Sequence, residues 1–415
     1  MRDQVTFVTT IGHGSMDKYA MELGRRLPVP RLVTDVYEES ADVWSLPLLS
    51  RASLRLARAD VRFVRELRAV DGVVHLPNHH LGRYGRFLSR PYAITVHDLI
   101  RYFDLARAAE PLIHPPNRRD RLLLRLDYAG IRRAAAVITA SQSTRRDVID
   151  HLGVPPEKVH VVHLGIDHEL YRPVERRVRE GPYVVFVGTE HPRKNFARVL
   201  EAFAAVKRAG ADRALKLVKV GAPGKGEWPF REATERRLRE LRLGDDVVFT
   251  GRVSDEDVVA LYAGARCLVL PSLYEGFGFP VLEAMACGCP VVTSTVSSIP
   301  ELAGDAALLV DPCDVDAIAA ALRRVVEDDA LRASLRERGL RRAARFTWDR
   351  TARATLAVYE RVWPRAGRRA GEYRGGTPRR RESPWRDARP RPRGPAPRAS
   401  RPRNGPRSSR PSSAS

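Results

Sequence analysis

The chain has 415 residues, 43% of them hydrophobic and 29% charged, which suits two or three domains and exceeds one ordinary core. Four cysteines in this length exclude a disulfide scaffold. No stretch approaches the roughly 18 apolar residues of a membrane span, and the first residues lack a signal-peptide core. We therefore expect a cytoplasmic protein, or one that lies peripherally on the membrane, whose clustered cysteines Cys287, Cys289 and Cys313 are small buried apolar residues.

The net charge of +22 is concentrated near one end of the chain. Residues 366–415 contain 15 arginines and three acidic residues, so this segment alone carries +12. It is otherwise rich in Pro, Ser and Gly and cannot bury enough surface to offset the entropy of ordering, which predicts a disordered tail. The tail is either solvated or a tether for nucleic acid or membrane. Because no nucleic-acid recognition motif accompanies it, we expect no specific nucleic-acid partner.

Short β-branched apolar runs alternate with helical patterns along most of the chain. Strands are predicted over 5–11, 73–76, 93–96, 137–140 and 159–163, and a second set over 183–187, 215–220, 247–249, 267–270, 290–293 and 308–310. A charged, Pro-flanked stretch without periodicity separates the two sets. The alternation predicts an α/β protein with two doubly wound, Rossmann-like domains, over 1–172 and 173–345.

The most informative stretch begins at Ser272, after an apolar strand. Gly276 and Gly278 predict a tight loop, and the proline that follows fits the first position of a helix. This places Glu275 in a strand-to-helix loop and Glu283 near the first turn of the helix, at the sheet edge where α/β folds bind ligands. Backbone N–H groups there can bind hydroxyls or phosphate, and two carboxylates can grip the hydroxyls of a sugar and a ribose.

As a whole, the string Ser-x-Tyr-Glu-Gly-Phe-Gly-x-Pro-x-Leu-Glu-Ala-Met-Ala-x-Gly-x-Pro-Val-Val resembles the signature of the retaining glycosyltransferases of family 4, the glycosyl transferases group 1. Val-Gly-Thr-x-x-Pro-Arg-Lys-Asn at 187–195 resembles mannosyltransferase-like members. The resemblance covers most of residues 1–365 and implies the GT-B fold, in which two domains face a cleft and the last helix, expected over 346–365, crosses back to the first domain. It implies that a hexose, with mannose as first choice, moves from a nucleotide sugar to a hydroxyl acceptor in glycan, polysaccharide or glycolipid synthesis.

Arg193 and Lys194 can be interpreted without the resemblance. They precede Asn195, a good N-cap for a helix over 196–207, so two cations stand where the helix dipole disfavours them. An anion held between them and the backbone amides would explain the pair, and a nucleoside diphosphate fits. The alternative is an exposed basic pair in an arginine-rich protein. In the family, the matching lysine contacts the pyrophosphate.

The resemblance assigns roles to the remaining site residues. Glu275 would hold the transferring sugar, Glu283 would hold the ribose, and His97, after a strand, would contact the donor sugar unless it is a satisfied structural histidine. The catalytic candidates are thus Glu275, Lys194, Arg193 and His97. Further donor contacts are expected at Gly14, Gly188, Val253, Gly276, Phe277 and Gly278, and the acceptor is expected near Asn78, His79 and Asp98.

Two Asp-x-Asp patterns, at 255–257 and 314–316, match the metal-binding motif of glycosyltransferases with another fold. Both stand where helices are predicted to begin, so we interpret these acids as helix caps and expect no metal and no other cofactor. Arg193, Lys194 and backbone amides would instead stabilise the charge that develops on the departing nucleoside diphosphate.

Arginines at 51, 55, 58, 62 and 65 recur at helical spacing and form one stripe. The stripe suits an anionic membrane or a polyprenyl-phosphate acceptor, and a solvated helix face is the alternative. Other functions remain open: a sugar-nucleotide epimerase of the same fold, which would not need both Glu275 and Glu283, or a non-enzyme that binds nucleic acid or membrane through its basic tail. A silent scaffold would be expected to have lost Glu275 or Lys194.

Overall fold

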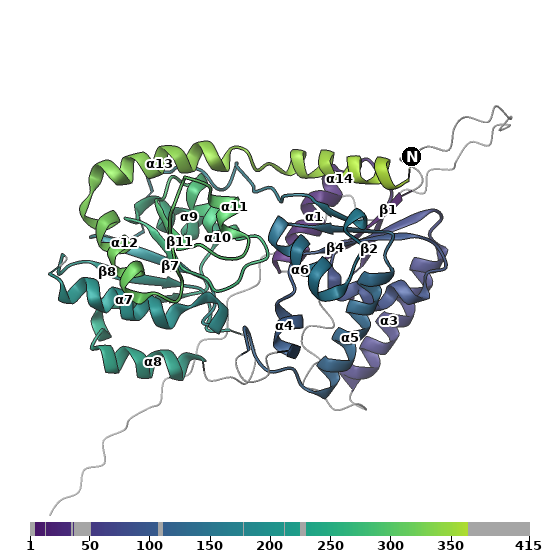
Figure 1. Ribbon diagram of the computed structural model, residues 1–415, viewed down its shortest axis with the longest axis horizontal. Coiled ribbons are helices and arrows are strands. Elements are labelled where there is room, and N and C mark those ends of the chain that lie inside the picture. The colour runs from purple at the N-terminus through teal and green to yellow at the C-terminus, as the bar shows by residue number, and fades with distance from the viewer. Residues whose placement is uncertain are drawn as a thin grey trace, which may run out of the picture. The chain divides into compact units, whose positions relative to one another are not determined.

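The computed structural model describes residues 5–12, 14–34, 36, 51–106, 111–176, 178–210, 212–224 and 230–363, with 51–56 described as backbone alone. The tail predicted over 366–415 lies outside these residues. Two six-stranded sheets organise the fold (Figure 1), and neighbouring strands pair in parallel in both. The predicted alternation of strands and helices is therefore confirmed.

The first sheet has the strand order β2-β1-β3-β4-β5-β6. Its strands are β1 (Val5–Thr10), β2 (Arg31–Thr34), β3 (Val73–Leu76), β4 (Tyr92–Val96), β5 (Ala136–Thr139) and β6 (Val159–Val161). The sequence did not predict β2, because this edge strand buries only its last residue and lacks a continuous apolar run. The order reverses between β1 and β3, so the loops that follow these two strands are neighbours.

The second sheet has the order β12-β11-β10-β7-β8-β9, which is the doubly wound arrangement with its reversal between β7 and β10. Its strands are β7 (Tyr183–Val187), β8 (Lys216–Val220), β9 (Val247–Gly251), β10 (Leu268–Leu270), β11 (Val291–Ser294) and β12 (Leu308–Val310). Because helices cover both faces, the central strands are buried throughout and appear in the sequence as continuous apolar runs.

Helices connect the strands and cover the sheets (Figure 1). They are α1 (Ser15–Arg26), α3 (Arg51–Ala69), α4 (Ile100–Ala106), α5 (Arg118–Arg133), α6 (Gln142–Leu152), α7 (Phe196–Arg208), α8 (Phe230–Leu241), α9 (Asp255–Gly264), α10 (Phe279–Ala286), α11 (Ile299–Ala303), α12 (Val315–Glu327), α13 (Asp329–Ala343) and α14 (Trp348–Val362), with 3₁₀ turns η1 (His79–Phe87), η2 (Pro156–Lys158), η3 (Pro192–Lys194) and η4 (Gly244–Asp246). No helix in the described ranges is both long and apolar enough to cross a membrane.

Two local predictions have clear outcomes. The Asp-x-Asp patterns do begin helices: Ser254 caps α9, whose first turn holds the first pattern, and Asp314 is itself the N-cap of α12. Cys287 and Cys289 are buried as expected, but Cys313 is exposed. The prediction for Cys313 is wrong because this residue lies in the surface turn before α12. Its N–H donates a hydrogen bond to the carboxylate of Asp311, and its side chain is outside the core.

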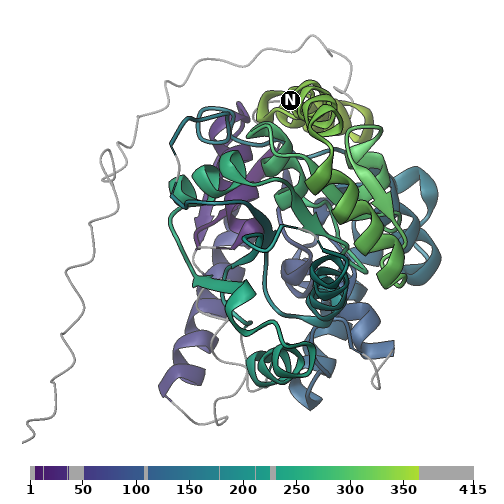
Figure 2. The ribbon, with the colours of Figure 1, turned by 90° about the vertical axis from the view of Figure 1, so that its left-hand side faces the viewer.

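Helix α14 packs beside α1, as Figure 1 shows and Figure 2 presents after a quarter turn. An ion pair of 3.2 Å joins Arg26 to Asp349 at the start of α14. Near its other end, the buried Tyr359 hydroxyl lies 2.5 Å from Nδ1 of His75 on β3. Burial of Trp348 and Tyr359 fixes the helix against the first sheet's elements. The last helix of the described chain thus returns to the segments that begin it.

Candidate active site

The loops after β7 and β10 meet where the strand order of the second sheet reverses, and three predicted residues come together there. The Nζ atom of Lys194 lies 2.6 Å from Oε1 of Glu275, and Nη1 of Arg193 lies 3.1 Å from Oε2. The hydroxyl of Ser272 donates to Oε1 at 2.8 Å. The sequence indicated an anion between the two cations, and here the carboxylate of Glu275 itself occupies that position.

Electrostatics hold this cluster in its charged form. Burial alone would raise the pKa of Glu275, but the adjacent cations Lys194 and Arg193 outweigh burial and lower it to about 2. Burial lowers the pKa of the Lys194 ammonium, and the Glu275 carboxylate offsets part of that effect. Because both side chains are only 8% exposed, each charge is largely removed from water and depends on the other for its stabilisation. The pair is a preorganised charge site at the edge of the sheet.

Asn195 stands at the N-cap position of α7, but the prediction that its side chain caps the helix is wrong. Its backbone is left-handed, with φ of 63°, and its side chain makes no capping hydrogen bond. The amide Nδ2 instead donates to the carbonyl oxygens of Pro271 at 2.9 Å and Pro312 at 2.6 Å. Asn195 therefore ties η3, which carries Lys194, to the loop after β10.

Gly276 allows the two domains to meet at the site. A Cβ atom at this position would lie 2.1 Å from the carbonyl oxygen of His97, so only glycine fits against the end of β4. Gly278 has φ of 108° and is the N-cap of α10, so the helix begins at Phe279 and Pro280 is its second residue rather than its first. The loop thus places the backbone after Glu275 directly against the first domain.

Glu283 lies in α10 and is half-buried. Its Oε2 atom accepts a hydrogen bond of 3.5 Å from the hydroxyl of Tyr262. Burial raises its pKa, against the lowering effects of Lys18 and of a hydrogen bond from Tyr171. Tyr171 and Tyr262 were missed by the sequence analysis, because neither lies next to a recognisable motif. Glu283 and Glu275 thus stand in separate environments, one lined by tyrosines and the other by cations.

The other donor candidates occupy different places. Gly188 follows β7, and a Cβ there would lie 3.5 Å from the Lys194 side chain, so this residue borders the charged cluster. Val253 follows β9 and packs against the hydrophobic core of the second sheet. Phe277 is buried in the loop after β10. Gly14 precedes α1, where its N–H donates to Oδ2 of Asp17 at 3.2 Å.

His97 follows β4 and is buried and neutral. Its Nε2 donates to the carbonyl oxygen of Pro77 at 2.9 Å, which leaves Nδ1 as a hydrogen-bond acceptor. Burial and the neighbouring His79 lower its pKa to about 4. The ring of Tyr19 packs edge-on at 4.7 Å and fixes the imidazole plane. A neutral imidazole of this kind can accept a hydrogen bond from a sugar hydroxyl.

The three acceptor candidates lie close to His97 in the first domain. Asn78 is fully buried, and its Oδ1 accepts the His80 N–H at 2.9 Å, which begins η1. The ring of His79 is also buried, with its centroid 6.4 Å from that of His97. Asp98 is partly exposed, and its Oδ1 accepts the Ile100 N–H at 3.0 Å. Asp98 is thus the one of the three with a partly exposed side chain.

Contacts of α6 with the loop after β10 were not foreseen from the sequence. The Thr144 hydroxyl lies 3.3 Å from the carbonyl oxygen of Gly276 and 3.4 Å from that of His97. The Tyr274 hydroxyl donates to Oδ2 of Asp147 at 2.5 Å. The contacts of Thr144 with Gly276 and of Tyr274 with Asp147 join residues more than 120 positions apart, so only the packing of the two domains brings these pairs together.

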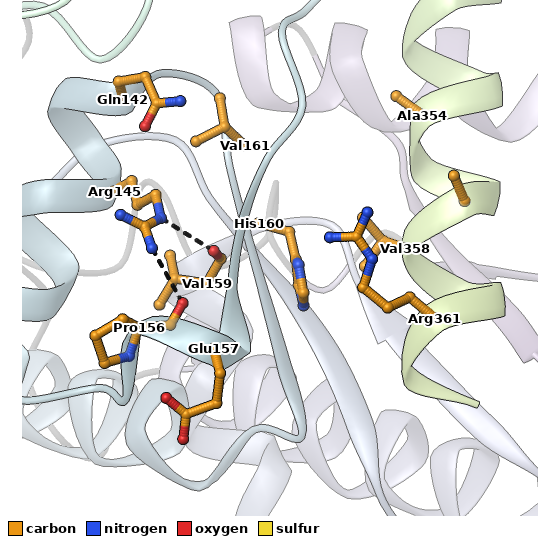
Figure 3. A pocket seen from close by; sticks show the side chains of 11 residues that line it. Gln142, Arg145, Pro156, Glu157, Val159, His160, Val161, Ala354, Val358 and Arg361 are labelled. Carbon is orange, nitrogen blue, oxygen red and sulfur yellow. Dashed lines mark hydrogen bonds between the residues drawn. The ribbon is translucent and has the colours of Figure 1, made fainter. Parts of the chain in front are cut away.

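A separate hollow of about 600 Å³ lies between α6, β6 and α14 (Figure 3). His160 and Arg361 point toward one another across it, and Arg145 bonds to the carbonyl oxygens of Pro156 and Val159. None of the predicted catalytic, donor or acceptor residues lines this hollow. The two cations and the Glu275 carboxylate instead meet at the switch point of the second sheet, with Glu283 on α10 and the neutral His97 at the end of β4 in the first sheet.

This arrangement suits a ligand with both phosphoryl and hydroxyl groups. Arg193, Lys194 and the amides of the glycine loop can bind phosphate oxygens, and Glu275 and His97 can accept hydrogen bonds from hydroxyls. Within the described ranges, no group of three or more His, Cys, Asp or Glu is placed to hold a metal ion.

Comparisons with known proteins agree on one family. Residues 4–170 match the family model described as Glycosyltransferase Family 4, and residues 167–342 match that of Glycosyl transferases group 1. The O-antigen chain mannosyltransferase B of Escherichia coli is 33% identical over 300 residues, which span 70% of this chain and 74% of that protein. The MMP alpha-(1->4)-mannosyltransferase of Mycolicibacterium hassiacum is 33% identical over 365 residues, 84% of each chain.

Solved structures show the same fold. Sucrose-phosphate synthase from Thermosynechococcus elongatus superposes with a TM-score of 0.67 at 22% identity, covering 87% of this chain and 99% of that one. Anabaena HepE in complex with UDP and glucose superposes with a TM-score of 0.68 at 18% identity, covering 86% and 99%. The chain therefore belongs to the glycosyltransferases of family 4, the glycosyl transferases group 1, and is a glycosyltransferase built from two Rossmann-like domains of the GT-B type.

Proposed function

We propose that this glycosyltransferase transfers mannose from a nucleotide sugar, GDP-mannose as the first candidate, to a hydroxyl acceptor with retention of anomeric configuration and without a metal. The observation that carries the proposal is the buried cluster of Glu275 with Lys194 and Arg193, whose loop meets the backbone of the neutral His97 at Gly276. The mannosyltransferase names of two relatives at 33% identity support the choice of sugar.

The cluster supports a specific sequence of charge exchanges. The donor diphosphate would form ion pairs with Arg193 and Lys194, which Glu275 binds in this structure. The carboxylate oxygens of Glu275 would then be available to the sugar hydroxyls. As the glycosidic bond breaks, an oxocarbenium-like sugar forms and negative charge gathers on the leaving diphosphate. Lys194 and Arg193 would stabilise that charge, Glu283 would bind the ribose, and the acceptor would attack from the leaving-group face while a diphosphate oxygen takes its proton.

A donor screen tests this proposal directly. Purified full-length protein is incubated with UDP-, GDP- and TDP-sugars, and release of the nucleoside diphosphate is measured with and without EDTA. We expect GDP-mannose to turn over fastest, EDTA to change nothing, and NMR recorded before the released mannose mutarotates to show the donor's anomeric configuration. Preference for another sugar would overturn the mannose assignment, and an inverted product would overturn the retaining mechanism. UDP-glucose is the informative competitor, because a structure of HepE holds it.

The arginine stripe on α3 gives a prediction about membranes. Arg58, Arg62 and Arg65 are exposed, on the helix face opposite the buried Phe63 and Leu67. We propose that this face contacts anionic lipid, where each charge contributes about 1 kcal/mol. Replacing the three arginines by Gln should weaken binding to phosphatidylserine-containing vesicles by up to about 100-fold, as measured by co-sedimentation.

The control for the stripe is an equal loss of charge elsewhere. Exposed arginines on α7 and α8 provide it, and the control variant replaces Arg208, Arg236 and Arg239 by Gln. This variant should bind vesicles like the wild type. Equal weakening by both variants would show that net charge alone matters, and no weakening by either would leave the stripe as a solvated face.

A further inference from the structure

The N-terminus of α6 in the first domain forms hydrogen bonds with a side chain of the second domain. Ser141, the N-cap, accepts the N–H of Thr144 at 3.0 Å. The N–H groups of the two residues before Thr144 have no acceptor within the helix, because a helix leaves its first N–H groups unpaired. Glu301, from α11 of the second domain, supplies that partner. Its Oε1 accepts the Gln142 N–H at 2.9 Å, and its Oε2 accepts the Ser143 N–H at 3.2 Å.

A third bond to Glu301 also crosses the domain boundary. The Nε2 atom of His163, which follows β6, lies 2.9 Å from Oε1 of Glu301. One carboxylate thus receives hydrogen bonds from two segments of the first domain, and it faces the positive end of an eleven-residue helix. Burial alone would raise the pKa of Glu301, but these bonds lower it and keep the group ionised.

The turn before α11 connects this contact to the charged cluster. The hydroxyl of Ser298 donates to the carbonyl oxygens of Glu275 and Phe277, both at 2.9 Å. The hydroxyl of Ser297 accepts the Glu275 N–H at 3.1 Å and donates to its carbonyl oxygen at 2.5 Å. Both backbone groups of Glu275 are therefore held by residues that lie three or four positions before Glu301.

We propose that Glu301 is a positioning residue that latches the two domains together and, through the Ser297–Ser298 turn, holds the Glu275 loop against His97. The tight approach of Gly276 to His97 depends on the domains staying closed, and Glu301 adds to the contacts that Thr144 and Tyr274 make across the same boundary. Glu301 touches neither sugar nor diphosphate in this scheme. It acts through the loop that does, so its effect on turnover rests on the proposed function, whereas its effect on the loop does not.

Hydrogen exchange tests the latch without any substrate. Full-length wild type, Glu301→Ala and Glu301→Gln are compared by mass spectrometry for the peptides that cover residues 141–145 and 272–279. We expect Glu301→Ala to raise exchange at least tenfold in both peptides. The N–H groups of Gln142 and Ser143 lose their acceptor, and the 272–279 loop loses the support of the Ser297–Ser298 turn when the latch opens. Glu301→Gln, which keeps one acceptor oxygen but no charge, should have a smaller effect. The control Glu327→Gln removes an ion pair confined to α12 and should change neither peptide.

Kinetics with GDP-mannose provide the second readout. Glu301→Ala should lower kcat/KM about tenfold, with Glu301→Gln in between. Unchanged exchange at 141–145 would overturn the latch, and faster exchange there alone would overturn the coupling to Glu275. Normal kcat/KM despite faster exchange in both peptides would overturn the positioning role. An inactive wild type would count against the proposed function, while the exchange result would still decide the latch.

Discussion

Lys194→Ala is expected to lower kcat by about 10²–10³, the range for losing one preorganised stabiliser of developing charge. The ammonium lies 2.6 Å from Glu275 in the buried cluster, where the leaving diphosphate would gain its charge. Donor KM should rise less, because Arg193 and the loop amides still hold the ground-state diphosphate. The fold should survive, since Glu275 keeps Arg193 and Ser272 as partners. Steady-state kinetics with circular dichroism measure both effects.

A matched control for Lys194 lies on the adjoining helix. Lys207, near the end of α7, pairs with Asp246 at 3.3 Å and is 15% exposed, so it is also an ion-paired, mostly enclosed lysine. Lys207→Ala should leave kcat within about twofold. A Lys194→Ala variant with raised KM and intact kcat would show that this lysine binds ground state and transition state equally.

The sequence could predict the two loops of the site because, in a parallel α/β sheet, the loops that follow the strands lie at the carboxyl edge of the sheet. Strands alternate with helices, so the segments after 183–187 and 267–270 must end at one edge of the sheet. Their positions on either side of the strand-order reversal then bring Lys194 close to Glu275. The chemistry of each residue was visible in its type, but the contact between Lys194 and Glu275 follows from the strand order, which only the structure shows.

Details that depend on backbone conformation or on domain packing were beyond the sequence. Asn195 is a residue type that favours an N-cap, but its left-handed backbone turns the amide toward Pro271 and Pro312. The cations at 193 and 194 indicated a bound anion from outside the protein. The sequence does not show that the carboxylate of Glu275 lies next to them. The grip of Glu301 on α6 joins residues 158 and 159 positions apart and depends on how the domains close.

Glu275→Gln is expected to cost both activity and stability. Gln keeps the shape but removes the charge that would act on the sugar, so kcat should fall by about 10²–10³. The variant also leaves Lys194 buried without its counter-charge, and breaking one side of a buried pair costs about 3–5 kcal/mol. The pKa of Lys194, already lowered by burial, falls further when Glu275 no longer offsets that effect. Urea unfolding at neutral pH measures the loss, and Glu327→Gln is the control with an exposed, same-helix ion pair.

The pH dependence of unfolding identifies the same carboxylate. Burial alone would raise the pKa of Glu275, but Lys194 and Arg193 lower it from 4.5 to about 2, which contributes roughly 3 kcal/mol to the folded state. Because the pKa is lower in the folded state, this stabilisation is complete above pH 4.5 and is lost as the pH falls toward 2. Wild type should therefore lose more stability over that interval than Glu275→Gln, and equal losses would contradict the assignment.

The double variant Lys194→Met with Glu275→Gln separates the two roles of the pair. Removing both charges removes the uncompensated ammonium, so the double variant should be more stable than Glu275→Gln alone, by about 1–3 kcal/mol. Activity should not return, because both the cation for the diphosphate and the carboxylate for the sugar are gone. Recovery of stability without recovery of kcat would show that the pair acts in the reaction as well as stabilising the fold. A double variant that regains turnover would mean that neither charge acts on the donor.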